Sequence, residues 1–465
     1  MLLAASLLGA PAAWALDPWG THSRIAPDAA TPWTANEALP AVPLPQPTLP
    51  TAARYTLAQL TQLALQHNPD TRAAWAAAQA AAADLGIATA DYLPSFDVNA
   101  SAVRSRSANS SGTPLPSQTR YNANLSVTWL LFDFGARGAT RDAARANLIA
   151  ANLEQNQAIQ NVVLAVEQAY YQLLGLQALE LATEQSLKTA EANLDAVKRR
   201  VAAGLATLGD AYQVETTVAQ ARLNLQQAQG QAAAARGALA TAAGLSVDTP
   251  LALEPWPTQT PVTEVSAVVE ELLKQARGGR PELIAAQARV EAALANRRAA
   301  AAGGRPTLSL TGNSGRTRVI DQDDFPQSSV GLTLTVPLFN GFRTTYEVRR
   351  AEAERAQAEA ARDRLYYDVQ RQVWEAYYNQ RTAAATITNA QALQRSARQA
   401  AEVARARYRA GIGTVLEVLS TQTAEAQADV QTIQAQLNWY VGVAQLAHAL
   451  GTLGPNDVEP REATP

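Results

Sequence analysis

The feature that most constrains the fold is that the chain repeats its own pattern. The segment NPDTRAA at 68–74 returns as RPELIAA at 280–286, and YLPSFDVNAS at 92–101 returns as GRPTLSLTGN at 304–313, both 212 residues later. Three later segments return 207 residues further on: VTWLLFDFG (127–135), EQAYYQL (167–173) and AAGLATLGDAY (202–212). Matched segments in the same order indicate an internal two-fold repeat. The first half is five residues longer between Pro94 and Phe132, which predicts an exposed loop in that interval.

Each half contains two segments in which apolar and polar residues alternate, which is the pattern of a strand with one apolar face. These segments are Leu93 to about Arg106, Tyr121–Phe134, Thr307 to Asn313 and beyond, and Ser329–Phe339. Polar loops rich in turn residues, 108–119 and 316–327, separate the members of each pair. We therefore predict two strand hairpins, within 93–134 and 305–340, whose strands of ~10–13 residues match the length that crosses a bilayer when tilted.

After each hairpin the period changes from two residues to alternating three and four. No proline occurs from Ala136 to Ala203, and large apolar residues form a heptad seam. The seam residues are Ile159, Val162, Val166, Tyr170, Leu173, Leu187, Leu194, Val197 and Val201, and in the second half Val430, Ile433, Leu437, Val441 and Ala444. The pattern predicts long helix pairs over 136–244 and 343–451, in which each long helix of roughly 100 Å turns back into an antiparallel partner.

The apolar strand faces need a cover, and the sequence has no amphipathic helix left to supply it. Four strands cannot close a barrel, and open sheet edges are not tolerated in lipid, but three chains of four strands give a closed barrel of twelve. We therefore expect a mixed α and β membrane protein: a trimeric twelve-stranded barrel continued by a long coiled-coil barrel of helices. The side chains expected to face lipid are Tyr121, Leu125, Val127, Trp129, Val330, Leu332 and Leu334, and those expected to face a watery lumen are Asn122, Asn124, Ser126 and Thr128.

Composition excludes several other classes. The net charge is −3 without a basic run, which argues against a nucleic-acid partner. The chain has no cysteine, so disulfides, thiolate metal sites and lipidation at an N-terminal cysteine are excluded, and three scattered histidines predict no metal site. The sequence contains no run of eighteen apolar residues, so no membrane-spanning helix is predicted. No phosphate loop, catalytic triad or pair of catalytic acids occurs, so neither an enzyme nor a cofactor is expected.

The termini and the join between the halves have distinct compositions. The first residues form a short apolar run ending in a small-x-small site, which predicts an exported chain with a signal peptide over 1–15. The segment 16–54 is rich in proline and is expected to be extended. The predicted organisation is a signal peptide (1–15), an extended segment (16–54), a first repeat (55–245), a linker (246–265), a second repeat (266–452) and a C-terminal tail (453–465).

The order of a helix, a strand hairpin and a long helix pair, with the motifs NPDTRAA, YLPS, LFDFG, AYYQL and AGLATLGD, resembles the TolC family of outer-membrane channel proteins. The resemblance covers Tyr55 to Gly451. It implies a homotrimer in the outer membrane of a Gram-negative bacterium, with a helical tunnel in the periplasm. It also implies a passive export duct that works with a periplasmic adaptor and an inner-membrane pump of RND, MFS or ABC type, in efflux or type I secretion. The linker and the tail would form part of a belt around the helices.

The family closes its tunnel where the helical hairpins turn, which by motif corresponds to 204–210 and 411–420. The resemblance places the carboxylate of the constriction at Glu417, and Ser420 stands where the family has a second acid. Tyr408 and Asp210 would stabilise the gate, but Gly413 stands where their arginine partner is expected. The hairpin tips expected to contact the adaptor are Gly204, Leu205, Gly411, Ile412 and Gly413.

A competing reading of the helices alone is a soluble trimeric coiled-coil scaffold in the periplasm. Membrane fractionation separates this reading from the outer-membrane duct, because only the duct requires detergent for extraction. Whether the duct exports small molecules or proteins stays open at the level of the sequence.

Overall fold

The computed structural model describes residues 54–255, 268–320 and 323–454. The signal peptide predicted over 1–15 lies outside the described residues, as do nearly all of segment 16–54 and parts of the predicted linker and tail. The described elements belong to one compact unit.

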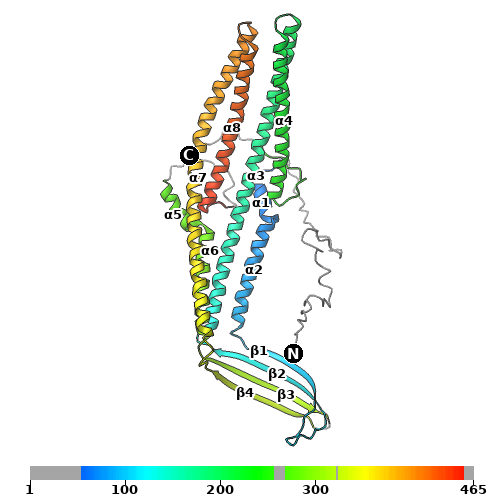
Figure 1. The fold of residues 1–465 in the computed structure, drawn as a ribbon, viewed down its shortest axis with the longest axis vertical. Helices are drawn as coiled ribbons and strands as arrows, with labels where there is room; N and C mark the ends of the chain where they lie inside the picture. The colour runs from blue at the N-terminus through cyan, green and yellow to red at the C-terminus, as the bar shows by residue number, and fades with distance from the viewer. Residues whose placement is uncertain (1–53, 256–267, 321–322, 455–465) are drawn as a thin grey trace, which may run out of the picture. The chain divides into compact units, whose positions relative to one another are not determined.

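The same order of two helices, two strands, a long helix and its partner occurs twice along the described chain (Figure 1). The first half contains α1 (Leu57–His67), α2 (Pro69–Ala90), β1 (Ser95–Ser105), β2 (Gln118–Phe132), α3 (Ala136–Ala202) and α4 (Leu208–Ala242). The second half contains α5 (Val269–Gly279), α6 (Pro281–Ala302), β3 (Thr307–Val319), β4 (Phe325–Thr335), α7 (Arg343–Arg409) and α8 (Val415–Leu450). The two long helices α3 and α7 have 67 residues each, and the predicted long helix pairs are confirmed.

The four strands form one antiparallel sheet in the order β1-β2-β3-β4, at one end of the helices (Figure 1). The two hairpins meet through β2 and β3, so each half of the chain contributes one hairpin. The strands β1 and β4 are the edges of this sheet. An edge strand has unpaired N–H and C=O groups, which a further strand can satisfy.

The second hairpin differs from its prediction. The strand expected at Ser329–Phe339 is Phe325–Thr335, and the loop expected over 316–327 is confined to the residues between Val319 and Phe325. Pro337 has no N–H for the ladder, which accounts for the earlier end of β4. The strand also begins earlier than expected. Pro326 does not prevent this, because β4 is an edge strand, where proline is tolerated.

The helices pack side by side along their length. The long helix α3 packs against α2, α4, α6 and α8, and α7 packs against α6 and α8. Val162, Val166, Tyr170, Leu173 and Val197 of the predicted α3 seam are buried. In α8 the predicted seam is partly wrong: Leu437 and Ala444 are buried but Val430 is exposed, because the buried stripe follows Ala428, Thr432, Ala435 and Trp439 instead. Among the described helices, none has an apolar stretch long enough to cross a membrane.

The short helices α1 and α5 were not separated by the sequence patterns, yet each completes an apolar cluster. Leu60 and Leu63 of α1 pack against Val166, Tyr170 and Leu239 of the long pair, and Leu272 of α5 packs in the same way against the second pair. At both places the last glycine of the long pair lies against the turn after the short helix. A Cβ on Gly244 would come within 2.9 Å of the Asn68 nitrogen, and one on Gly451 within 2.5 Å of the Gly279 oxygen.

A buried ion pair joins the second of these turns to the end of α8. Arg280 and Glu282 are both buried and form a salt bridge. Arg280 also donates to the backbone oxygen of His448 at 3.0 Å and to the side chain of Gln372 at 2.7 Å. Buried charges are stable only when they are paired in this way. The corresponding Asn68 in the first half reaches the backbone oxygen of Ala242 at 3.2 Å.

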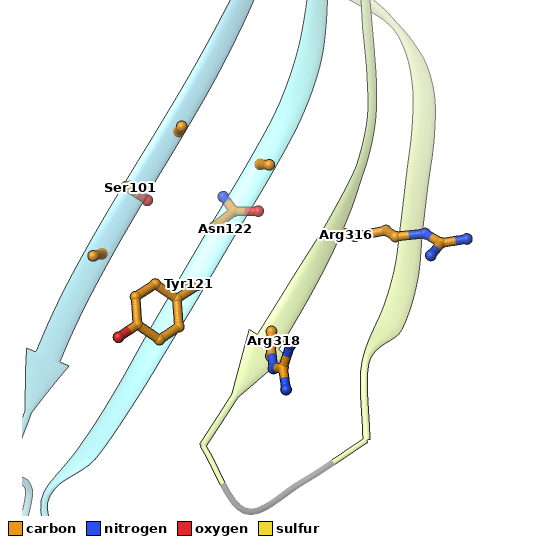
Figure 2. Close-up of a pocket in the computed structure, with 8 residues that line it drawn as sticks. Ser101, Tyr121, Asn122, Arg316 and Arg318 are labelled. Atoms are coloured by element: carbon orange, nitrogen blue, oxygen red, sulfur yellow. The ribbon is translucent and has the colours of Figure 1, made fainter.

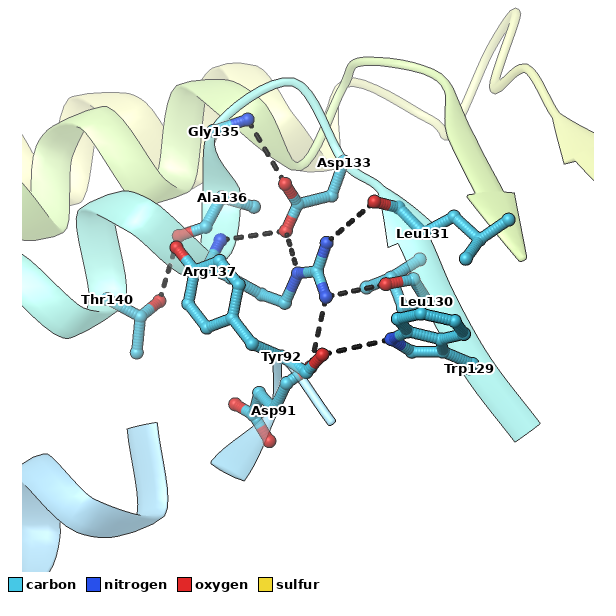
Figure 3. Close-up of polar contacts among 10 residues, drawn as sticks. All are labelled: Asp91, Tyr92, Trp129, Leu130, Leu131, Asp133, Gly135, Ala136, Arg137 and Thr140. Atoms are coloured by element: carbon cyan, nitrogen blue, oxygen red, sulfur yellow. Dashed lines mark hydrogen bonds and ion pairs between the residues drawn. The ribbon is translucent and has the colours of Figure 1, made fainter. Parts of the chain in front are cut away.

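The passage from β2 into α3 is held by one arginine (Figure 3). Arg137 donates to the carboxylate of Asp133 and to the backbone oxygens of Asp91, Leu130 and Leu131. Burial raises the pKa of the Asp133 carboxyl, but backbone N–H donors and Arg137 outweigh it and hold that pKa below its usual range. Nearby, the indole N–H of Trp129 donates to the backbone oxygen of Tyr92 at 2.9 Å. The contacts fix the direction of α3 relative to the sheet.

Candidate functional site

The two helical hairpins end in turns of the same geometry, at the end of the helices away from the sheet (Figure 1). Gly204 and Gly411 follow α3 and α7 with φ of +70° and +77°, a conformation that favours glycine. The next residue donates back into the helix in both turns, Leu205 to Arg200 at 2.8 Å and Ile412 to Arg407 at 3.0 Å. These are Schellman-type helix ends, so the backbone reverses within a few residues.

A threonine begins each returning helix. The Thr207 hydroxyl accepts from the Asp210 backbone N–H, while the Asp210 carboxylate accepts from the Thr207 N–H at 2.9 Å. Thr414 accepts from the Glu417 N–H at 3.2 Å. The carboxylate of Asp210 is thus engaged within its own turn, and among the described residues its hydrogen bonds go to Thr207 and not to Tyr408.

Tyr408 is instead held by Arg200, a residue that the sequence patterns did not single out. The Arg200 guanidinium lies 4.5 Å from the centre of the Tyr408 ring and donates to the Tyr408 backbone oxygen at 3.0 Å. Arg200 belongs to α3 and Tyr408 to α7, 208 residues further along the chain. No local signal in the sequence could have paired them. The contact joins the two hairpins close to their tips.

An apolar cluster lies beside this contact and also joins the two hairpins. It contains Val197 of α3, Ala211 and Val214 of α4, and Val415 and Leu419 of α8, all buried, with Leu194, Val201 and Tyr408 packed against them. Because four helices contribute to it, the tips of one chain are held together as a unit.

Three of the predicted gate residues, Tyr408, Gly413 and Glu417, lie close together. A Cβ added to Gly413 would come within 3.2 Å of the Glu417 carboxylate, the Tyr408 nitrogen and the Arg407 Cβ. A larger side chain would therefore have to displace its neighbours. The Glu417 side chain is exposed, while the Ser420 hydroxyl donates to the Glu417 backbone oxygen at 3.1 Å. Glu417 is thus free to face whatever lies beyond the tip.

The tips expose large apolar side chains. Leu205 and Ile412, which the sequence assigns to adaptor contact, are 69% and 71% exposed. Leu208 and Leu416, at the first turns of α4 and α8, are similarly exposed. Sequence patterns do not single them out, because one apolar residue after a turn forms no repeating pattern. Exposed apolar groups clustered on one surface are typical of a contact site for another protein.

On the sheet side of the tips, a hollow of about 710 Å³ lies between the two hairpins. Its polar wall includes Arg398 and Arg405, which form ion pairs with Glu425 and Asp429 of α8. Asn193 of α3 donates to Gln422 of α8 at 2.7 Å, which adds a direct bond between the hairpins. The ion pairs join α7 to α8 within the second hairpin, and exposed pairs of this kind stabilise little.

The sheet separates its side chains by polarity. One face carries Tyr121, Leu125, Val127 and Trp129, and the register adds Phe96, Val98, Leu308, Leu310, Val330, Leu332 and Leu334. Val98 is 80% exposed and Val330 is 83% exposed, so no described part of the chain covers this apolar face. The other face carries Asn122, Asn124, Ser126 and Thr128, with Asn124 donating to Asn313 at 2.7 Å and Asn99 to Ser126 at 3.3 Å.

Within the described ranges, no group of acidic or histidine side chains is placed to hold a metal ion. The candidate surfaces in this part of the chain are the hairpin tips and the two faces of the sheet.

Comparison with known proteins identifies the family to which this architecture belongs. The model of the family described as "Outer membrane efflux protein" matches residues 60–245 and 272–452, one match in each half. The chain belongs to the outer membrane efflux protein family. It is 32% identical over 433 residues to Protein CyaE of Bordetella pertussis, covering 91% of this chain and 90% of that protein. It is 28% identical over 405 residues to outer membrane protein OprJ of Pseudomonas aeruginosa, covering 85% of this chain and 84% of that protein.

A solved structure with the same fold is the outer membrane protein VceC of Vibrio cholerae. It has a TM-score of 0.75 and 25% identity, and the match covers 85% of this chain and 96% of that one. The resemblance noted from the motifs is thus confirmed. The protein is an outer-membrane channel component of an export system, and its helices form the periplasmic part. Members of this family act with an adaptor and an inner-membrane pump, and the family is one of channels.

Proposed function

We propose that three copies of this chain close a twelve-stranded barrel and continue it as a helical tunnel, forming a passive duct across the outer membrane. The observation that carries the proposal is the four-stranded sheet with free edges β1 and β4 and an uncovered apolar face. Such a sheet can lie in lipid only when neighbouring strands satisfy its edges. The matching order of elements in 55–245 and 266–452 further supports an origin by duplication.

The dimensions of the sheet support the assignment of its faces. Tyr121 and Trp129 lie eight residues apart on the apolar face, which at ~3.4 Å per residue is about 27 Å along the strand. A tilt of 35–45° leaves roughly 20 Å along the membrane normal, close to the apolar band of known outer-membrane barrels. Aromatic residues at both limits fit the two interfaces, and the hydrogen-bonded Asn124 and Asn313 fit a watery lumen.

The hairpin tips are proposed to close the duct. Three Glu417 side chains, one from each subunit, would surround the opening and favour cations through their negative potential. Gly413 cannot supply the arginine expected from the family, and Arg200 holds Tyr408 in its place. Asp210, which is engaged in its own helix cap, would act on the gate only through the orientation of α4.

The exposed tips are proposed to receive the adaptor. Leu205 and Leu208 of the first hairpin and Ile412 and Leu416 of the second form the apolar surface for this contact. The backbone reversals at Gly204 and Gly411 bring these side chains to the end of each hairpin. An inner-membrane pump of RND, MFS or ABC type would supply the energy through that adaptor, and no cofactor takes part in the duct.

Purification from membranes in detergent, followed by native mass spectrometry and planar-bilayer conductance, tests the duct. We expect a trimer that conducts ions with a preference for cations, and we expect Glu417→Ala to lose that preference. A monomer in plain buffer would overturn the duct as a whole. A conducting trimer whose cation preference survives in Glu417→Ala would overturn only the position of the constriction, and Ser420→Ala serves as the matched control.

A further inference from the structure

A pair of arginines lies on the apolar face of the sheet, toward the end away from the helices (Figure 2). The register pairs Arg318 with Tyr121 and Arg316 with Ala123, and paired residues in an antiparallel sheet point to the same face. Arg104 of β1 follows the same alternation and donates to the Ser117 hydroxyl at 3.2 Å. Three guanidinium groups therefore border the apolar rows at one end only.

A hollow of about 480 Å³ lies beside Arg316 and Arg318. Its floor consists of the small side chains of Ala100, Ala102 and Ala123, and Tyr121, Arg316 and Arg318 border it. Figure 2 shows Arg316 extending across β4 and Arg318 lying near the end of β3. The hollow thus has a positive rim and an apolar floor that continues into the row of Val98 and Leu125.

The positive charge at the rim is only partly neutralised. Arg318 lies 3.7 Å from the Asp324 carboxylate, and both side chains are exposed, so the pair contributes little. Arg316 is exposed and has no hydrogen-bond or ion-pair partner in the part of the chain that the structure describes. An arginine beside a lipid-facing apolar row is stabilised by an anion at the interface.

We propose that this hollow binds the phosphate-bearing headgroup of a lipid in the outer leaflet. The proposal rests on the proposed duct, because it requires the Tyr121 face to point outward into the membrane. The guanidinium fork binds a phosphate through two parallel hydrogen bonds, which an ammonium group does not reproduce. The acyl chains of the same lipid would follow the alanine floor onto the apolar rows, so one molecule satisfies both halves of the hollow.

The location in the membrane agrees with this ligand. The helices leave the sheet at the ends formed by Ser95, Phe132, Thr307 and Thr335, so the arginines are nearer to the loops at the opposite end. Because the helices are periplasmic, that end reaches the outer leaflet. A phosphorylated headgroup lies there at the level of the interfacial aromatic residues, which Tyr121 marks.

The test uses the purified full-length protein in detergent and counts bound lipid by native mass spectrometry. The probe is diphosphoryl lipid A, compared with lipid A from which both phosphates have been removed and with inorganic phosphate alone. The variants are Arg316→Gln with Arg318→Gln, the pair Arg316→Lys with Arg318→Lys, and the matched control Arg120→Gln. Arg120 lies at the same end of β2 but on the polar face, paired with Val319.

We expect the trimer to retain the phosphorylated lipid and to release the dephosphorylated one. The double glutamine variant should bind about a hundredfold more weakly, at about tenfold for each charge-assisted contact. The lysine pair should recover part of the binding, and Arg120→Gln should bind like the parent.

Equal binding of the two lipids, or unchanged binding by the double glutamine variant, would overturn the site. Occupancy by inorganic phosphate at the lipid's own concentration would show an anion site without a lipid. Loss of binding in Arg120→Gln alone would place the lipid on the other face. A parent that forms no conducting trimer would instead refute the duct, whereas a conducting trimer without lipid preference would refute this site only.

Discussion

Removing the Arg200 guanidinium is expected to open the tunnel. Arg200→Gln keeps a long polar side chain on α3 but removes the cation from the Tyr408 ring and shortens the reach to the Tyr408 backbone oxygen. Both contacts join α3 to α7 at the tip. The Arg200 guanidinium lies 4.5 Å from the centre of the Tyr408 ring and donates to the Tyr408 backbone oxygen at 3.0 Å. Opening that separates the two hairpins must break both.

The size of the effect follows from the contacts. A cation over an aromatic ring contributes about 0.5–1 kcal/mol at a partly exposed site, and a hydrogen bond from a charged group contributes about 1.5–3 kcal/mol. Taking the lower values, because Arg200 is half-buried, gives about 2 kcal/mol for each subunit. Three subunits opening together lose about 6 kcal/mol, which is enough to convert a population that is 99% closed into one that is mostly open.

Single-channel conductance in planar bilayers measures this directly. The parent trimer should stay mainly in a low-conductance state, and the Arg200→Gln trimer should remain in a high-conductance state. Tyr408→Phe is the matched control, because it keeps the ring and the backbone oxygen that Arg200 contacts and should conduct like the parent. Tyr408→Ala removes only the ring and should give an intermediate open fraction.

Arg200 would have no part in closing the tunnel if Arg200→Gln conducted like the parent while both proteins were folded trimers. The role of the Arg200 contacts would also be refuted if Tyr408→Phe opened the channel as fully as Arg200→Gln, since the phenol hydroxyl would then be the gating group. The energy for the trimer applies when all three subunits open together. An intermediate conductance level in trimers that mix parent and variant subunits would therefore measure the contribution of one contact.

Three other predictions concern the rest of the chain. Gly451→Ala should lower the melting temperature followed by circular dichroism more than Gly204→Ala does. Both positions have positive φ, but only Gly451 meets a backbone oxygen at 2.5 Å, and crowding of this kind costs about 1–3 kcal/mol; equal effects would refute the close contact. Burial lowers the pKa of His448, with Arg280 adding to the shift, so stability should fall as pH drops below ~6.5, and His448→Gln should flatten that dependence in melting curves from pH 7.5 to 5.5. Amide exchange should be faster at 340–344 than at 133–137, where Arg137 holds the backbone; equal rates would contradict the difference.

The regular elements follow from residue periods that act locally. The alternation from Tyr121 to Trp129 predicts both the strand and its two faces, because successive side chains of a strand point to opposite sides. The spacing of Val162, Val166, Tyr170 and Leu173 predicts the buried stripe of α3 in the same way. Such patterns are visible because the same choice of residue repeats along one element.

The second hairpin shows where that signal fails. Arg316, Thr317, Arg318 and Val319 alternate as a strand should, and Thr317 and Val319 are buried, yet the charges suggested a loop. The strand period is present there, but charged residues occupy the exposed positions that alternate with the buried ones, so a search for alternating apolar residues does not mark the strand. The α8 seam fails for a related reason: small and polar residues such as Ala428 and Thr432 occupy the buried stripe, and hydrophobicity alone does not mark them.

The contacts of the candidate site could not be predicted in this way. Arg200 meets Tyr408 across 208 residues, and nothing in the local sequence of either residue indicates the other. The carboxylate of Asp210 is engaged by Thr207, which the threonine three residues earlier could have signalled as a capping box. The resemblance supplied positions for the gate, but the contacts around Gly413 are properties of this chain.

The two halves share one order of elements but differ in how firmly the long helix is held to the sheet. We expect this difference to decide which hairpin moves. At the sheet, Phe134 and Gly135 adopt positive φ before α3, as Gly341 and Phe342 do before α7. The first junction is then fixed by Arg137, which contacts four residues. At the second, the exposed Asn340 side chain bonds Thr344, the Arg343 side chain bonds Glu347 and the Arg343 N–H donates to the Asn340 backbone oxygen, all within the start of the helix. We therefore expect the α7–α8 hairpin to move more on the sheet than the α3–α4 hairpin during opening, with Arg200 of α3 restraining it through Tyr408.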